Sequence, residues 1–115
     1  MRAAGGSVDD VARWAAALQL QVGALAWKAQ KALETPPCQA SAQQYAQTSW
    51  KGLMSDKQVA EIDAAAWAQS KNAGQAAEAK TLAERAITGY RRACEDAVTH
   101  QEWLLQKCPQ IRNAR

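Results

Sequence analysis

The sequence predicts an all-α protein, a small bundle of about four helices, and two observations support this fold class. Of the 115 residues 27 are Ala, the best helix former, whereas Val, Ile and Leu together number 16. Apolar residues also recur at spacings of three and four along much of the chain. A composition of 48% apolar and 22% charged residues is typical of a globular protein. We therefore expect one domain over 1–115, with flexible ends at 1–7 and 110–115.

The first predicted helix covers residues 8–33. Ser7 is a good N-cap residue, and Asp9 and Asp10 in the first turn favour a helix start. Its apolar residues form a seam of the kind that helical bundles bury: Val11, Ala15, Leu18, Val22, Leu25, Ala29 and Ala32. Pro36 and Pro37 end the helix because proline lacks the backbone donor and restricts the residue before it.

Capping signals divide the rest of the chain. A Ser41–Gln44 box precedes a short helix at 42–51, which Gly52 ends. A Ser55–Gln58 box predicts a new helix at 56–70, with an apolar face of Val59, Ile62 or Asp63, Ala66 and Trp67. A continuous helix at 75–107 carries the last apolar face: Leu82, Ala86, Ile87, Tyr90, Cys94, Val98 and Leu104 or Leu105.

The first helix carries apolar residues on a second face as well. Leu20 lies about 200° around the helix from Leu18, Trp27 follows seven residues later, and the run from Trp14 to Trp27 contains no charge. Fourteen residues are too few to cross a bilayer. This face is either covered by the chain itself or meets a partner protein or a membrane surface, where Trp is common. Candidate partner-interface residues are Trp14, Leu20, Trp27 and Trp50.

Three cysteines leave at least one thiol unpaired, and their spacing fits no metal site. Either all three are reduced and buried, or Cys38 forms a disulfide with Cys94 or Cys108. Cys94 and Cys108 lie about 21 Å apart along one helix, so they cannot bridge to each other.

No arrangement of residues predicts catalysis. His100 and Cys94 are six positions apart and point away from each other on a helix, and the adjacent acidic pairs diverge. The net charge of +3 is dispersed, which argues against nucleic acid as a partner. We expect no catalytic residue, no cofactor, no metal and no small-molecule substrate.

Trp50-Lys51-Gly52 resembles the Trp-X-Gly turn of the small helical proteins that type VII secretion systems export. The resemblance covers three residues. The chain departs from that family at Pro36 and Pro37, which interrupt the first helix, and at Cys94, which stands where the export signal has an acid after Tyr90. No function is carried over from it.

By elimination, the sequence favours a non-catalytic interaction protein, a small accessory subunit of a larger complex. A basic, Ala-rich chain suits a membrane-associated mitochondrial or other organellar complex. A secretory signal is not expected, because Asp9 and Asp10 precede the apolar run. The alternative is a self-contained inhibitor or immunity-type protein of the bacterial periplasm, stabilised by a disulfide from Cys38.

Overall fold

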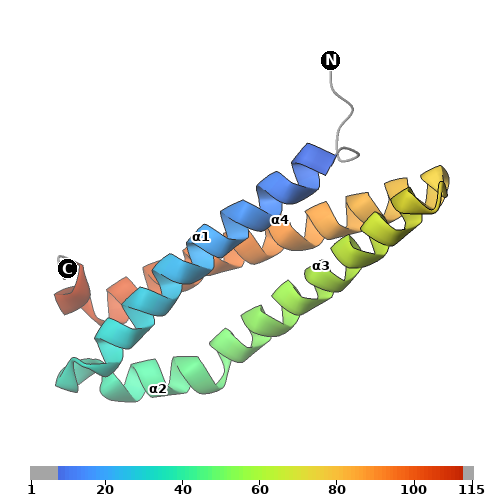
Figure 1. Ribbon diagram of the computed structural model, residues 1–115. Coiled ribbons are helices and arrows are strands. Elements are labelled where there is room, and N and C mark those ends of the chain that lie inside the picture. Colours follow the sequence, from blue (N-terminus) through green and yellow to red (C-terminus); the bar gives the residue numbers. More distant parts are fainter. Residues whose placement is uncertain (1–7, 113–115) are drawn as a thin grey trace.

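The computed structural model describes residues 8–112, and every regular element within that range is a helix. Three rods make up the fold: α1 (Val8–Leu33), α4 (Ala76–Lys107), and a bent rod of α2 (Gln39–Gln47) followed by α3 (Ser49–Asn72) (Figure 1). Short 3-10 helices follow α1 and α4, namely η1 (Pro36–Cys38) and η2 (Pro109–Ile111). The predicted small all-α bundle is confirmed.

Helix α4 is the central rod. It packs against both α1 and α3, whereas α1 and α3 make little contact with each other. The molecule is 55 Å long, and the 32 residues of α4 account for about 48 Å of that length at 1.5 Å per residue. The arrangement is therefore open, and α1 and α3 are edge helices.

Helix α1 has the predicted bounds of residues 8 and 33. Its fully buried residues repeat every seven positions, as in helices that pack in left-handed pairs: Val11, Leu18, Leu25 and Ala32. Beyond the helix, the Thr35 hydroxyl donates a 2.8 Å hydrogen bond to the Lys31 carbonyl oxygen, and the two prolines form η1. The predicted N-cap, Ser7, lies outside the described residues.

The buried face of α4 consists largely of alanine. Its buried residues are Ala79, Ala83, Ala86, Ile87, Tyr90, Ala93, Cys94, Ala97 and Leu104. Because methyl groups project little, helices can approach α4 closely. Gly89 marks such a point, since a β-carbon there would lie 3.1 Å from the Cβ atom of Ala60 on α3. The prediction of one continuous helix over 75–107 is confirmed, as α4 runs from 76 to 107 without a break.

The predicted boundaries around residues 42–70 are wrong. The short helix lies at 39–47 instead of 42–51, and α3 covers 49–72 instead of 56–70. Gly52 and Ser55 both lie inside α3, so neither ends or caps a helix, and Ser41 likewise lies inside α2. Leu53, Ala60 and Trp67 explain the continuity, because they are buried at intervals of seven and hold one face of α3 against the core.

Thr48 produces the bend between α2 and α3. Its backbone leaves the helical region, with φ −122° and ψ −80°, and its hydroxyl donates a 2.7 Å hydrogen bond to the Gln44 carbonyl oxygen. Such a bond to the preceding turn competes with the helical backbone pattern and bends helices. Trp50-Lys51-Gly52 is therefore helical, and the structure contains no turn of the Trp-X-Gly kind at that point.

A glycine reverses the chain between α3 and α4, where the sequence predicts a break. Gly74 has φ +78°, a left-handed conformation that glycine adopts without strain. The Gln75 amide donates to the Ser70 carbonyl oxygen at 2.9 Å, and the Gly74 amide donates to that of Lys71 at 3.1 Å. This pair of bonds is a Schellman motif, which satisfies the last carbonyl groups of α3.

A disulfide joins two segments that are far apart in the sequence and meet at one end of the molecule. Cys38 in η1 is bonded to Cys108 after α4, with their Cα atoms 5.6 Å apart. Of the two pairings left open by the sequence, the structure contains the one with Cys108, and Cys94 is a free, buried thiol. Ile111, which we assigned to a flexible end, is buried beside this link in η2.

Three apolar residues expected on core-facing stripes lie at the surface. The side chains of Val59 and Ile62 on α3 are 57% and 60% exposed, and Val98 on α4 is also exposed. The buried face of α3 passes through Leu53, Ala60 and Trp67, of which the sequence predicted Trp67. A helical face that includes Val59 is rotated by about 100° from one that includes Ala60, and the structure buries the latter.

Enlarging Ala60 tests the close packing of α3 on α4. Ala60→Leu should reduce the free energy of unfolding by about 1–3 kcal/mol, because the added carbons have no room beside Gly89. Urea denaturation measures this loss. Ala65→Leu, on the exposed side of α3, is the matched control; equal stability of the two variants would contradict the packing described here.

Removing the disulfide tests how strongly it restrains the unfolded chain. Cys38→Ser with Cys108→Ser should lower the free energy of unfolding by about 3–5 kcal/mol, since the bond closes a loop of 70 residues. Urea denaturation again provides the measurement, with reduction of the wild-type protein as a second route. A double variant as stable as the oxidised wild type would show that the bond does not form.

Candidate interaction surface

The outer face of α1 exposes two large apolar side chains to solvent. Leu18 is fully buried, and Leu20 lies about 200° further around the helix, so its side chain is 75% exposed. Trp27 lies two turns along on the same side and is 39% exposed. Ala16 and Gly23 lie beside them and are also exposed. We call the set Ala16, Leu20, Gly23, Ala24 and Trp27 the α1 outer face.

Charged groups lie only at the two ends of the α1 outer face. No charged residue occurs from Trp14 to Trp27, and Arg13 precedes this run. At the other end, the ammonium group of Lys31 lies 5.5 Å from the centroid of the Trp27 ring, within the range of a cation–π contact. The nearer Lys28 is turned towards α4, where its ammonium donates a 3.2 Å hydrogen bond to Gln101 Oε1. The centre of the face is therefore uncharged.

Trp14 lies in a different place from Leu20 and Trp27. Its indole is half-buried and lines a shallow apolar hollow between α1 and α4, together with Ala17, Cys94 and Val98. The Arg91 guanidinium lies 5.7 Å from the ring centroid. Six residues separate Trp14 from Leu20, which rotates the two side chains apart by about 240°. Trp14 thus belongs to the junction of α1 with α4.

Trp50 is also separate from the α1 outer face. It is half-buried in the first turn of α3, and its ring centroid lies 6.5 Å from that of Tyr45. Together with Ala26, Ala29 and Leu33, the two rings line a small hollow between α1 and the bent rod. Of the four residues predicted at an interface, the structure brings together Leu20 and Trp27 only.

An aromatic cluster around Tyr45 was not apparent from the sequence. The ring of Tyr45 stacks on Trp103 at 6.1 Å between centroids and meets the edge of His100 at 5.3 Å. The Tyr45 hydroxyl shares a 2.9 Å hydrogen bond with His100 Nδ1, and burial raises the pKa of Tyr45 above its ordinary value. Tyr45 and His100 are 55 positions apart in the sequence, so no local pattern predicts their contact. His100 is thereby oriented by a structural partner.

A polar network also fixes α1 on α4. The Gln101 side-chain amide donates to Gln21 Oε1 at 2.7 Å, while its oxygen accepts the bond from Lys28. Gln21 and Lys28 are seven residues apart and therefore lie on one side of α1. The network fixes the rotation of α1 about its axis, and with it the outward direction of Leu20 and Trp27.

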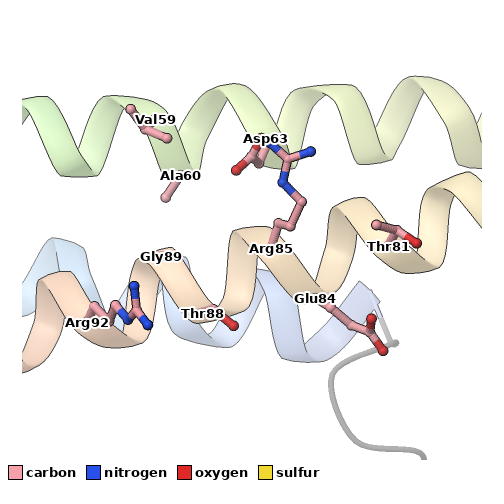
Figure 2. A pocket seen from close by; sticks show the side chains of 9 residues that line it. All are labelled: Val59, Ala60, Asp63, Thr81, Glu84, Arg85, Thr88, Gly89 and Arg92. Carbon is pink, nitrogen blue, oxygen red and sulfur yellow. Dashed lines mark ion pairs between the residues drawn. The ribbon is translucent and has the colours of Figure 1, made fainter.

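A groove with polar groups lies between α3 and α4. It is lined by Val59, Ala60 and Asp63 from α3 and by Thr81, Glu84, Arg85, Thr88, Gly89 and Arg92 from α4 (Figure 2). Arg85 reaches across to Asp63, with Nη2 3.4 Å from Oδ1. Glu84 and Thr88 point away from α3. Asp63, one of the carboxylates that line the groove, is therefore paired with an arginine that connects the two helices.

The surroundings of the remaining thiol, Cys94, disfavour its thiolate form. It is buried in α4, and burial, followed by the neighbouring Glu95, raises the pKa of its thiol. A reactive cysteine needs the opposite shift, because the thiolate is the nucleophile. Within residues 8–112, no group of three or more His, Cys, Asp or Glu side chains is placed to hold a metal ion.

Comparison with known proteins finds no match to this chain. No family model matches it, and neither do the curated proteins or the solved structures. Across the part of the chain that the structure describes, no helix is both long and apolar enough to cross a membrane.

Thiol labelling tests the cysteine assignments. In denaturant without reductant, one thiol per chain should react, and three should react after reduction, because Cys38 and Cys108 are bonded to each other. In the native protein at neutral pH the Cys94 thiol should react far more slowly than in denaturant, since burial disfavours the thiolate. Mass spectrometry counts the labels. Three labels before reduction would contradict the disulfide, and rapid native labelling would contradict the burial of Cys94.

Proposed function

We propose that this chain is a non-catalytic helical interaction protein that binds another protein through the α1 outer face, as a small subunit of a larger assembly. The observation that carries this proposal is the exposure of Leu20 and Trp27 on an uncharged face of a helix whose opposite face is buried. A single exposed leucine is ordinary in folded proteins. A contiguous uncharged face that includes a Trp resembles the centre of a protein interface, where Trp is enriched.

The contacts of the chemically versatile side chains support a non-catalytic role. Two of the three cysteines are bonded to each other, and the third is buried with a raised pKa. His100 is hydrogen-bonded to Tyr45, and Asp63 is paired with Arg85. Each of these groups therefore contributes to holding helices together.

The disulfide favours a second candidate function, a self-contained inhibitor or immunity-type binding protein of the bacterial envelope. A disulfide persists where the surroundings are oxidising and is rare in the cytosol. The Cys38–Cys108 bond therefore supports the periplasm more directly than it supports a reducing organellar matrix. The two candidates differ in whether the protein is isolated with its partner or alone.

Charge substitutions on α1 test the proposed binding surface. Leu20→Glu and Trp27→Glu should release the chain from its native complex while preserving helix content, because both side chains point outward. Leu18→Glu should unfold the chain, since that position is fully buried. The mass of the complex purified from the cells that make it reports binding, and circular dichroism reports folding.

Gln19→Glu is the matched control, as Gln19 is exposed and adjacent to Leu20. It should leave both the complex and the fold unchanged. Equal loss of helix in all three glutamate variants of apolar residues would contradict an outward-facing surface. A wild-type chain isolated alone at 12.5 kDa would favour the envelope candidate over the subunit.

A further inference from the structure

The α1 outer face extends into a longer stripe with a charge at each end. Arg13, Leu20, Trp27 and Glu34 are spaced seven residues apart, and all four are exposed. A spacing of seven drifts by only about 20° per heptad along a straight helix, so the four side chains lie within roughly 60° of one another. Glu34 directly follows α1, and its amide bonds to the Gln30 carbonyl oxygen at 3.1 Å, so it continues the helical geometry.

This stripe is complementary to itself when one copy is reversed. Its midpoint lies between Gly23 and Ala24. Leu20 and Trp27 lie at equal distances on either side of this midpoint, and so do Arg13 and Glu34. A twofold axis through the midpoint would therefore set Leu20 of one copy opposite Trp27 of the other, and Arg13 opposite Glu34, with each contact made twice. Self-complementarity of this kind is what a twofold interface between identical chains requires.

The residues around the midpoint allow two helices to approach closely. A β-carbon added at Gly23 would meet nothing within 4 Å, so the backbone there is open to solvent. Helices with small residues at their contact pack at the short end of the usual 8–10 Å separation. No charge lies between Trp14 and Trp27, so reversal brings no like charges together in the centre.

The ends of the stripe supply the charge complementarity. The Arg13 side chain is largely exposed and has only a long 4.0 Å pairing with Asp10. The hydrogen bond from Gln30, followed by the charge of Lys31, lowers the pKa of Glu34, so that this carboxylate is ionised at neutral pH. An unlike pair would therefore form at each end of the antiparallel contact.

We propose that the α1 outer face binds a second copy of the chain in an antiparallel, twofold arrangement, with Leu20 against Trp27 and Arg13 against Glu34 of the other copy. This inference rests on the proposed function, in which the face is a binding surface, and it names the partner. The contact from Arg13 to Glu34 is about 32 Å long at 1.5 Å per residue. One helix on one helix is small beside a standard interface of roughly 800 Å² per partner, so we expect a weak dimer that dissociates at about micromolar concentrations.

A charge-swap series on the purified full chain tests the arrangement. Analytical ultracentrifugation from low micromolar to several hundred micromolar should show the mass of 12.5 kDa rise to twice that value. Arg13→Glu and Glu34→Arg each set like charges together at both ends, so each should weaken association about tenfold. The double variant Arg13→Glu with Glu34→Arg restores both unlike pairs and should recover the wild-type dissociation constant. Lys80→Glu, an exposed charge change on α4, is the control and should have no effect.

Several results would overturn the proposed antiparallel arrangement of two copies. They are a wild-type chain that stays monomeric at every concentration, a dimer insensitive to Arg13 and Glu34, and a double variant that remains as weak as the single ones. Circular dichroism confirms that each variant is folded. A monomer that binds phosphatidylserine vesicles, with loss on Trp27→Glu, would also overturn it and assign the face to a membrane surface.

The proposed function fails separately from this inference. If the chain is monomeric but Leu20→Glu still disrupts the native complex, the α1 outer face is a binding surface and only the proposal of a second copy fails. If the Leu20→Glu and Trp27→Glu variants assemble as the wild type does, both the proposed function and the proposal of a second copy fail.

Discussion

The fold depends on the ability of α4 to accept a helix on two sides at once. Alanine methyl groups make up most of its buried face, and Gly89 lies against Ala60 where α3 is closest. Small side chains bring the helix backbones together, which compensates through close contact for the small apolar area that each alanine buries. A bulkier face would push α1 and α3 outward. The central position of α4 thus follows from the size of its side chains.

The same arrangement leaves the edge helices incompletely covered. α1 contacts α4 with the face of Leu18 and Leu25, and the described residues 8–112 form no fourth long helix that could cover Leu20 and Trp27. Val59 and Ile62 on α3 are exposed for the same reason. An alanine-rich chain of this length has few large side chains with which to close a bundle. Exposure of the α1 outer face is therefore a consequence of composition, and it is also the feature on which the proposed function rests.

One end of the molecule is held by contacts between residues far apart in sequence. The Tyr45 cluster joins α2 to the last turns of α4, and the disulfide joins the end of η1 to the end of α4. Both restrain the end where α1, the bent rod and α4 meet. Gln101 adds a third link by accepting from Lys28 and donating to Gln21. These links keep α1 in one rotation, so the same face always points outward.

The sequence by itself determined the helical class, the bounds of α1, the continuity of α4 and the second apolar face of α1. These features follow from local propensity, proline positions and heptad spacing, all of which act within one helix.

Local reasoning failed at Ser55, where a good capping box lies inside α3. The burial of Leu53, Ala60 and Trp67 outweighs a cap there, because packing stabilises a helix more than its end signals do. Only the tertiary structure decided that Cys38 pairs with Cys108, that Tyr45 meets His100, and that Trp14 and Trp50 lie apart from Leu20. Such contacts depend on how whole helices pack, and helix packing joins residues that no short stretch of sequence contains.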